Sequence, residues 1–260
     1  MAEPAALAVT AGGGFWNPAT MALSGENRLL LSVSSLNTPI EQAVSAQLGT
    51  VAYHVTEHIT AGVQLAQASV TDLIRTDTDP QSIGGEIPYR STIVSALAAA
   101  SRGGASVGVA LRRRSGEVDF TTGHATSLDV GGILERPGGI PVRLAASTFL
   151  RSVTGKGDRV ATLAAAEGIL PVRVVDVRAG LAYQRERETG SEVFAFTSAR
   201  TTLLEFRGGL ARQSAYGSST TRLRLGLSLR YARYLVGVAR EEGTAGLGSS
   251  YQFLLTTVFR

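Results

Sequence analysis

The sequence predicts an all-β protein, a transmembrane antiparallel β-barrel of about fourteen strands with a short N-terminal plug. Three observations lead to this prediction. Apolar and polar residues alternate with a period of two, the alternating segments are long, and short and longer connections alternate between them. A helical protein is excluded because no long stretch has helical spacing and no run of about 18 apolar residues occurs.

The alternation is clearest in residues 222–231. The odd positions from 223 to 229 are all Leu and position 231 is Tyr, whereas the even positions hold arginines and small residues. The same period recurs in residues 106–112, 142–151 and 175–184. Because successive strand residues point to opposite faces, each segment presents one apolar and one more polar face.

The length of these segments separates a soluble barrel or sandwich from a membrane barrel. Soluble strands usually run about five or six residues, whereas tilted membrane-spanning strands need about nine to eleven. Many segments here sustain about ten residues or more, which favours the membrane barrel. The predicted strands are 27–35, 47–56, 59–71, 90–102, 105–114, 124–136, 140–152, 158–169, 173–185, 191–200, 203–213, 219–231, 233–242 and 248–260.

The connections between these segments form two groups. Short ones are expected at 57–58, 103–104, 137–139, 170–172 and near 231–232, and longer ones at 36–46, 72–89, 115–123, 153–157, 186–190, 214–218 and 243–247. Short turns on one side and longer loops on the other are typical of bacterial outer-membrane barrels, with the turns in the periplasm. The first residues have no basic and apolar signal pattern, so we expect a mature exported chain.

The first 26 residues do not alternate and contain a Gly-rich, aromatic stretch. This stretch is too apolar to remain unpacked in the periplasm, so we expect residues 1–26 to form a plug inside a barrel of residues 27–260. Asn17-Pro18 is a turn-forming pair that would hold Phe15 and Trp16 in place as an apolar binding surface.

The N-terminal segment and the number of predicted strands together resemble a known family. The segment Phe15-Trp16-Asn17-Pro18-Ala19 followed by about fourteen strands resembles the FadL-type outer-membrane transporters of fatty acids and other hydrophobic compounds. The wider superfamily includes PorV- and PorQ-type barrels associated with protein secretion. The resemblance implies binding of a ligand by this segment.

The end of the chain supports the same superfamily. Tyr251, Phe253 and Phe259 share one face of the last predicted strand, similar to the C-terminal assembly signal of outer-membrane barrels and to the ends of PorV- and PorQ-type proteins. Arg260 after Phe259 departs from that signal. An aromatic residue at the membrane interface is the alternative interpretation, and it implies the same membrane.

The polar residues predicted to line the lumen are mostly arginine. They occur singly rather than in a patch with stacking aromatics, so nucleic acid is not an expected partner. We expect ladders of paired charges that hold barrel and plug together, with a weak anion preference as the alternative. The predicted lumen-lining residues are Arg178, Arg207, Arg222, Arg224, Asp176 and Glu205, with Glu167 as a further carboxylate partner.

Nothing in the sequence points to catalysis, a metal or a cofactor. Cysteine is absent, and His54 and His58 lie in a strand-like segment without a third ligand. His124 has Asp119 and Ser127 nearby but no nucleophile motif, so a solvent-exposed histidine is the preferred interpretation.

The function expected from the resemblance is passive transport of small hydrophobic molecules. The alternative is a non-transporting barrel that anchors or assists a surface or secretion protein. Expected partners are outer-membrane lipid, lipopolysaccharide and a hydrophobic small molecule.

Overall fold

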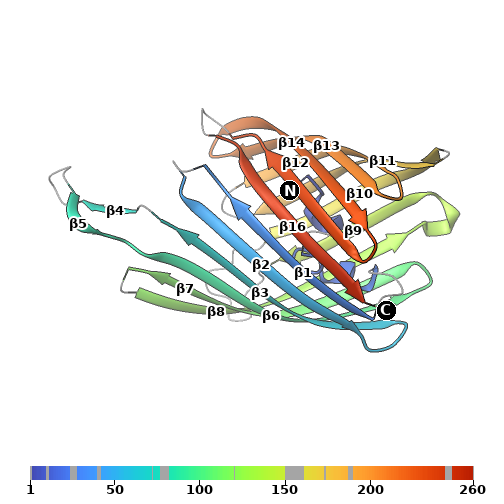
Figure 1. Ribbon diagram of the computed structural model, residues 1–260, viewed down its shortest axis with the longest axis horizontal. Coiled ribbons are helices and arrows are strands. Elements are labelled where there is room, and N and C mark those ends of the chain that lie inside the picture. Colours follow the sequence, from blue (N-terminus) through green and yellow to red (C-terminus); the bar gives the residue numbers. More distant parts are fainter. Residues whose placement is uncertain are drawn as a thin grey trace.

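The computed structural model describes residues 2–9, 12–23, 28–39, 42–71, 73–76, 82–119, 121–149, 161–172, 174–186, 190–243 and 248–259. Fourteen antiparallel strands form a closed barrel in which β1 pairs with both β2 and β16 (Figure 1). The barrel strands are β1 (Leu29–Asn37), β2 (Val44–His54), β3 (Ile59–Val70), β6 (Tyr89–Arg102), β7 (Ala105–Val118), β8 (Thr121–Glu135), β9 (Val142–Phe149), β10 (Ala161–Val172), β11 (Val175–Glu186), β12 (Gly190–Arg200), β13 (Leu204–Ala215), β14 (Ser218–Tyr231), β15 (Tyr234–Glu241) and β16 (Ser250–Phe259).

Each predicted strand overlaps one barrel strand, and the predicted all-β, antiparallel barrel of fourteen strands is confirmed. The connection predicted at 72–89 contains a separate two-stranded sheet of β4 (Ile74–Thr76) and β5 (Ser82–Glu86), so that β3 pairs directly with β6. A one-turn helix, η3 (Pro137–Gly139), lies between β8 and β9.

Two of the longer loops predicted from the sequence are wrong. β7 ends at Val118 and β8 begins at Thr121, and β13 and β14 are separated only by residues 216–217. The segments 115–123 and 214–218 are mostly polar residues and glycine, and their few apolar residues, such as Val118 and Tyr216, do not alternate regularly, so the pattern that marks a strand is lost. Backbone pairing continues there nevertheless, for example between Ser115 and His124, because the ladder needs no apolar side chains.

A smaller error concerns the turn predicted at 170–172. These residues are the last three of β10 and pair with β11. The turn at 103–104 is correct, and its two glycines have φ angles of +58° and +81°. Positive φ at both positions is what a two-residue hairpin turn requires.

The end of the barrel that carries the β2–β3, β6–β7, β8–β9, β10–β11, β12–β13 and β14–β15 connections is called the turn end here, and the opposite end the loop end. The start of β1 and the end of β16 also lie at the turn end. In barrels of this kind the short turns lie in the periplasm.

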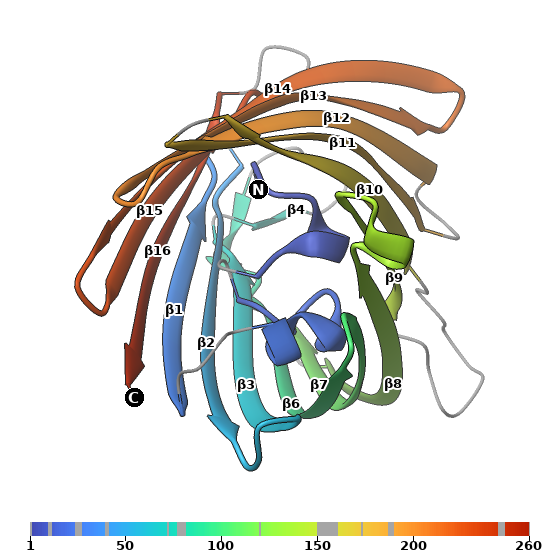
Figure 2. The ribbon, with the colours of Figure 1, turned by 90° about the vertical axis from the view of Figure 1, so that its right-hand side faces the viewer.

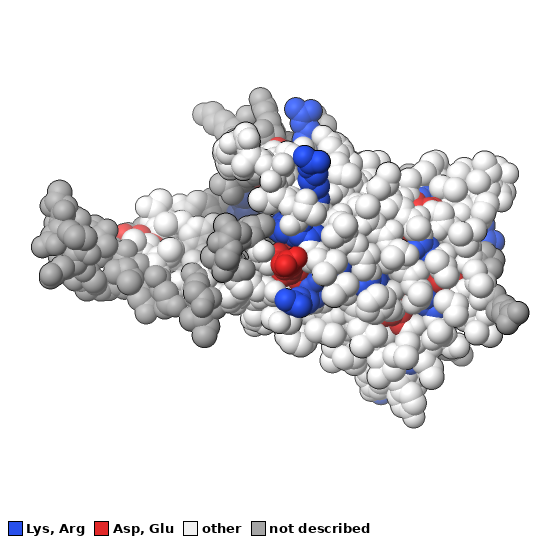
Figure 3. Space-filling model, turned by 90° about the horizontal axis from the view of Figure 1, so that it is seen from above, with Lys and Arg blue, Asp and Glu red and all other residues white. Residues whose placement is uncertain are grey.

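The apolar side chains of the strands face outward. In β7, Val107 and Leu111 are 63% and 54% exposed, whereas the alternating residues Ala110 and Arg112 are fully buried. Uncharged residues cover most of the described surface seen in Figure 3. An apolar outer face around a more polar interior is the inverse of a soluble barrel and is typical of a barrel in a lipid bilayer.

No helix among the described residues is long and apolar enough to cross a membrane.

The N-terminal segment, residues 2–9 and 12–23, lies inside the ring of strands (Figure 2). It contains two short 3-10 helices, η1 (Ala5–Leu7) and η2 (Pro18–Leu23). η2 contacts β6, β7 and β8, and η1 contacts β9 and β10. The interior packing of the barrel is therefore built around this segment, and its largest cluster of buried apolar residues includes Leu7, Phe15 and Ala19 together with wall residues.

Candidate functional site

Asn17 fixes the fold of the N-terminal segment. Its buried side chain donates a hydrogen bond from Nδ2 to the carbonyl of Ala6 (2.8 Å), and its Oδ1 accepts one from the backbone N–H of Ala19 (3.1 Å). The Thr20 hydroxyl donates to the carbonyl of Asn17 (2.8 Å) and accepts from the backbone N–H of Gly14 (2.7 Å). These bonds connect η1, the Gly-rich stretch and η2 into one unit.

Two glycines of the wall let this unit approach closely. A Cβ at Gly108 in β7 would lie 2.5 Å from the backbone nitrogen of Ala19 and 2.7 Å from the carbonyl oxygen of Pro18. A Cβ at Gly131 in β8 would overlap the Asn17 side chain. Backbone of the segment therefore packs directly on backbone of the wall, as glycine permits.

A buried ion pair links three strands to the segment. The Arg112 guanidinium in β7 contacts Asp129 in β8, and both side chains have no exposed surface. Arg112 also donates to the Ser95 hydroxyl in β6 (3.0 Å) and to the carbonyl of Phe15. A buried charge must be paired and hydrogen-bonded to be tolerated, and Asp129 and Ser95 hold the Arg112 guanidinium in place. Its hydrogen bond to the Phe15 carbonyl therefore fixes the position of Phe15.

Phe15 and Trp16 form an aromatic cluster with Phe149 of β9. Their ring centroids lie 5.1 Å apart with perpendicular planes, and Phe149 lies 5.3 Å from Phe15 and 4.7 Å from Trp16. The Arg112 guanidinium stands 4.8 Å from the centre of the Phe15 ring. The Trp16 carbonyl accepts a hydrogen bond from the Ser147 hydroxyl (3.0 Å). Both rings are thus held by the wall.

An apolar cavity of about 490 Å³ lies beside these two aromatics at the loop end. Phe15 and Trp16 form one side, and the facing wall is built from β1, β2, β3 and β6, with Glu241 and polar residues of β16 at its edge. The aliphatic residues of this wall include Leu36, Leu48, Ala66 and Ile93.

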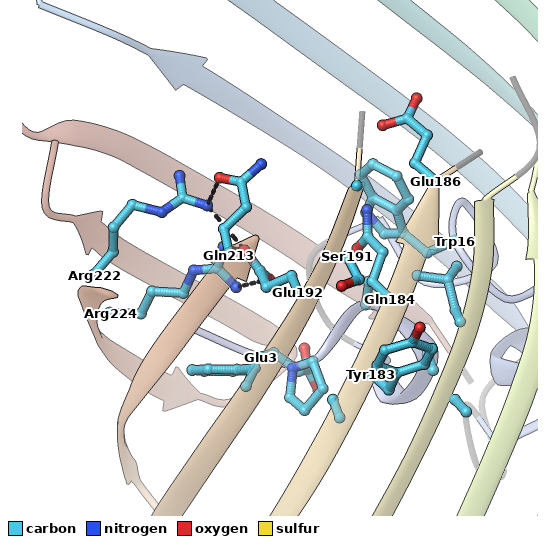
Figure 4. Close-up of a pocket in the computed structure, with 18 of the residues that line it drawn as sticks. Glu3, Trp16, Tyr183, Gln184, Glu186, Ser191, Glu192, Gln213, Arg222 and Arg224 are labelled. Carbon is cyan, nitrogen blue, oxygen red and sulfur yellow. Dashed lines mark hydrogen bonds and ion pairs between the residues drawn. The ribbon is translucent and has the colours of Figure 1, made fainter. Parts of the chain in front are cut away.

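A second cavity at the loop end, of about 270 Å³, is polar. Figure 4 shows Arg222 and Arg224 converging on Glu192 in its lining. Arg224 binds Glu192 through two nitrogens (2.7 and 2.8 Å), and both arginines also contact Glu241, at 2.6 Å for Arg222 and 3.0 Å for Arg224. Gln213 accepts a further hydrogen bond from Arg222 (2.9 Å). Two arginines and two glutamates thus form one network across β12, β14 and β15.

A third cavity, of about 530 Å³, lies at the turn end. Glu3 and Pro4 of the N-terminal segment line both this cavity and the polar cavity, so the segment separates them. Glu3 contacts Arg207 of β13 at 3.2 Å, and Arg207 also contacts Glu205 at 2.9 Å. Arg178 lies nearby and contacts Glu167 at 3.2 Å.

The sequence-predicted lumen residues therefore divide into separate groups. Arg222 and Arg224 belong to the polar cavity, whereas Arg178, Arg207 and Glu205 line the cavity at the turn end. Asp176 is exposed near the start of β11, opposite Arg200 in the strand pairing.

The histidines do not form a site. His124 is exposed in β8, and His54 and His58 lie at the β2–β3 turn. Within the described ranges no group of three or more His, Asp or Glu side chains is placed to hold a metal ion.

Sequence reasoning missed Arg112, Asp129 and Phe149. Their spacing does contain a signal, because Arg112 and Asp129 occupy the inward positions of their strands, next to outward Leu111 and Val130. Their contact depends on the register of β7 against β8, which places Ala110 opposite Asp129.

The closed barrel, its apolar outer face and its even number of strands define a membrane-spanning barrel of the outer-membrane type. Its fold is that of the FadL-type barrels. A FadL homologue of Pseudomonas aeruginosa is similar with a TM-score of 0.59 at 9% identity, over 96% of this chain and 98% of that one. The toluene transporter TbuX of Ralstonia pickettii is similar with a TM-score of 0.61 at 14% identity, over 94% and 92%.

No protein-family model matches the chain, and no curated protein matches it. The structural similarity confirms the predicted outer-membrane barrel at the level of the fold.

Proposed function

We propose that this barrel allows small hydrophobic molecules to pass the outer membrane without energy input, and that the apolar cavity beside Phe15 and Trp16 is where they bind. That cavity is the single observation that carries the proposal. Its volume of about 490 Å³ is in the usual range for small-molecule sites, roughly 300–1,000 Å³.

The chemistry of the lining favours an apolar ligand. Leu36, Leu48, Ala66 and Ile93 contribute aliphatic surface, and the aromatic faces lie opposite. Burying such surface against a ligand gains about 25 cal/mol per Å², whereas a charged ligand would lose hydration without a partner on this wall. Position at the loop end supports entry from outside the cell.

The N-terminal segment serves as the plug in this proposal, with residues 1–26 as plug and 27–260 as barrel. Its hydrogen bonds through Asn17 and its salt bridge from Glu3 to Arg207 keep it across the lumen. A ligand that leaves the apolar cavity toward the turn end must displace part of it. Passage is therefore slow and selective rather than pore-like.

The similar proteins support the same class of cargo. TbuX is named as a transporter of toluene, which is a small apolar molecule. No catalytic role is proposed for the barrel. The comparisons offer no support for the alternative of a non-transporting anchor or secretion partner.

Uptake into liposomes tests the proposal. The doubly substituted variant Phe15→Ala/Trp16→Ala should lose saturable uptake of a small apolar solute such as toluene. The matched control is Phe194→Ala/Phe196→Ala, which removes another pair of lumen aromatics, 5.6 Å apart, that does not line the apolar cavity. Deletion of residues 2–19 should give a leaky, non-selective pore.

Uptake that never exceeds that of empty liposomes would overturn the transport proposal and leave the anchoring role. Equal losses in both double variants would show that general loosening, rather than the apolar cavity, governs uptake.

A further inference from the structure

The cavity at the turn end carries more positive than negative charge. Among the residues that the structure describes, six arginines line it, together with four glutamates. The glutamates are Glu3, Glu135, Glu167 and Glu205, and the arginines are Arg143, Arg178, Arg200, Arg207, Arg230 and Arg233.

Three of the arginines use all four carboxylates. Arg143 contacts Glu167 at 2.6 Å and Glu135 at 3.9 Å, and Arg178 contacts Glu167 at 3.2 Å. Arg207 contacts Glu3 and Glu205 at 3.2 and 2.9 Å. Among the described residues, the other three arginines of this lining, Arg200, Arg230 and Arg233, have no carboxylate within ion-pair distance.

Arg200 and Arg230 are the important pair. Each is half-buried in the cavity, and neither side chain makes a hydrogen bond or ion pair with the residues that the structure describes. Arg200 lies opposite Asp176 of β11 and Glu205 of β13 in the strand pairing, but its guanidinium is not within ion-pair distance of either carboxylate. Arg233 differs, because it is exposed and stacks on Tyr234.

Hydrogen-bond donors are also in excess. The Nε of Arg143 and the Nε of Arg178 are buried and have no acceptor, and only 6% of Arg143 is exposed. A buried donor without an acceptor costs about 1–3 kcal/mol. Surplus positive charge and surplus donors thus occur in the lining of one cavity, and an anion would offset the charge.

We infer that the turn-end cavity is a binding site for a compact oxyanion, held between Arg200 and Arg230. Guanidinium groups bind phosphate and carboxylate oxygens through paired, charge-assisted hydrogen bonds. The volume of about 530 Å³ also leaves room for a molecule that carries such a group. The site is separate from the apolar cavity, so it does not depend on the proposed transport of hydrophobic molecules.

Titration of the detergent-folded protein with inorganic phosphate at constant ionic strength, followed by calorimetry, tests this site. We expect saturable binding, weakened about tenfold or more by Arg200→Gln or Arg230→Gln and abolished by both. Arg240→Gln is the control, because Arg240 faces outward near the loop end. Absence of binding by the unaltered protein, or equal binding by the double variant, would overturn the inference.

Two further measurements keep the test independent of folding. Heat-modifiable migration on gels shows whether each variant is folded, and Arg200→Lys, which keeps the charge, should retain most of the binding. Loss of binding in Arg200→Lys and Arg240→Gln to the same extent as in Arg200→Gln would contradict a local site.

Hexyl phosphate distinguishes a free oxyanion from the same group at the end of an apolar molecule. Equal affinity for phosphate and hexyl phosphate indicates a site for the free ion. Tighter binding of hexyl phosphate indicates that the apolar lining of the cavity, for example Leu30 and Leu235, contributes as well.

Discussion

The two halves of the barrel wall differ in charge. The neighbouring strands β16, β1, β2 and β3 contain no Asp, Glu, Lys or Arg, whereas each strand from β8 to β15 places at least one charged residue toward the lumen. Both halves have the same apolar outer face. The difference lies only on the inside, where the N-terminal segment meets the wall.

The two halves of the wall therefore have different roles in this account. The charged half holds the N-terminal segment, and the uncharged half borders the proposed ligand cavity. The charged wall and β7 hold the segment through Arg112, Asp129, Arg207 and Glu3. The uncharged wall contacts the segment without ion pairs, for example through Gln64, whose Nε2 donates to the carbonyl of Gly13 (2.9 Å), and it borders the cavity that Phe15 lines. Binding an apolar ligand beside charged side chains would remove water from those charges at a cost in free energy. The half of the wall without charged residues is therefore better suited to an apolar ligand.

The largest effect on stability is expected from Arg112 and Asp129, the buried ion pair that contacts the N-terminal segment. Arg112→Met should cost about 3–5 kcal/mol of unfolding free energy, because it leaves the Asp129 carboxylate buried without its guanidinium. Arg112→Met/Asp129→Leu should cost less than Arg112→Met alone. Urea unfolding of the protein in phospholipid vesicles measures both, and a doubly substituted protein that is less stable than either single variant would contradict this account of the pair.

The outer faces of the two halves should respond alike. Val63→Arg on β3 and Leu181→Arg on β11 replace side chains that are 56% and 60% exposed to lipid. Each should cost about 2–4 kcal/mol if the site is near the bilayer midplane. Val174→Arg, at a turn, should cost little. A large difference between Val63→Arg and Leu181→Arg, measured by the same unfolding assay, would show that the halves also differ on the outside.

The contact of the segment with β7 can be loosened by one methyl group. Gly108→Ala places a Cβ against backbone of Pro18 and Ala19, and such overpacking costs about 1–3 kcal/mol. Gly116→Ala, on the same face of the same strand, meets nothing within 4 Å and should change stability by less than about 0.5 kcal/mol. Equal thermal stability of the two variants would mean that the segment does not press on β7.

The smallest effects distinguish paired from unpaired arginines within the charged wall. Arg222→Gln removes one member of the network with Glu192 and Glu241, but Arg224 still contacts both carboxylates, so the cost should be about 1 kcal/mol. Arg200→Gln breaks no ion pair and should change stability by less than about 0.5 kcal/mol. Urea midpoints give the order, and a greater loss for Arg200→Gln would contradict the assignment of pairs.

Much of the fold was predictable because the alternation of apolar and polar residues identifies each membrane-spanning strand without knowledge of its neighbours. This alternation located all fourteen barrel strands, and it is clearest in β14, where leucines occupy alternating positions. It failed at 115–123 and 214–218, where the strands continue beyond the apolar band with mostly polar residues and no regular alternation.

The interior was less predictable. Period two indicates which residues point inward, but not which of them meet. The contacts of Arg112 with Asp129, and of Phe149 with Phe15 and Trp16, depend on register and on the path of a segment without periodicity. The absence of charge from β1, β2, β3 and β16 is visible in the sequence, but its meaning requires knowing that these strands are neighbours.

The central claim is that an apolar ligand binds between the aromatic side of the segment and the uncharged wall. Trp16 is the only tryptophan of the chain. It lines the polar cavity as well as the apolar one, so Ala66→Glu, at a residue that lines the apolar cavity and not the polar one, assigns the signal to the apolar cavity. Titration with 1-bromohexane, whose bromine quenches indole on contact, should give saturable quenching that hexane reverses and that Ala66→Glu abolishes. Quenching that rises linearly, is unaffected by hexane and is the same in Ala66→Glu would contradict the claim.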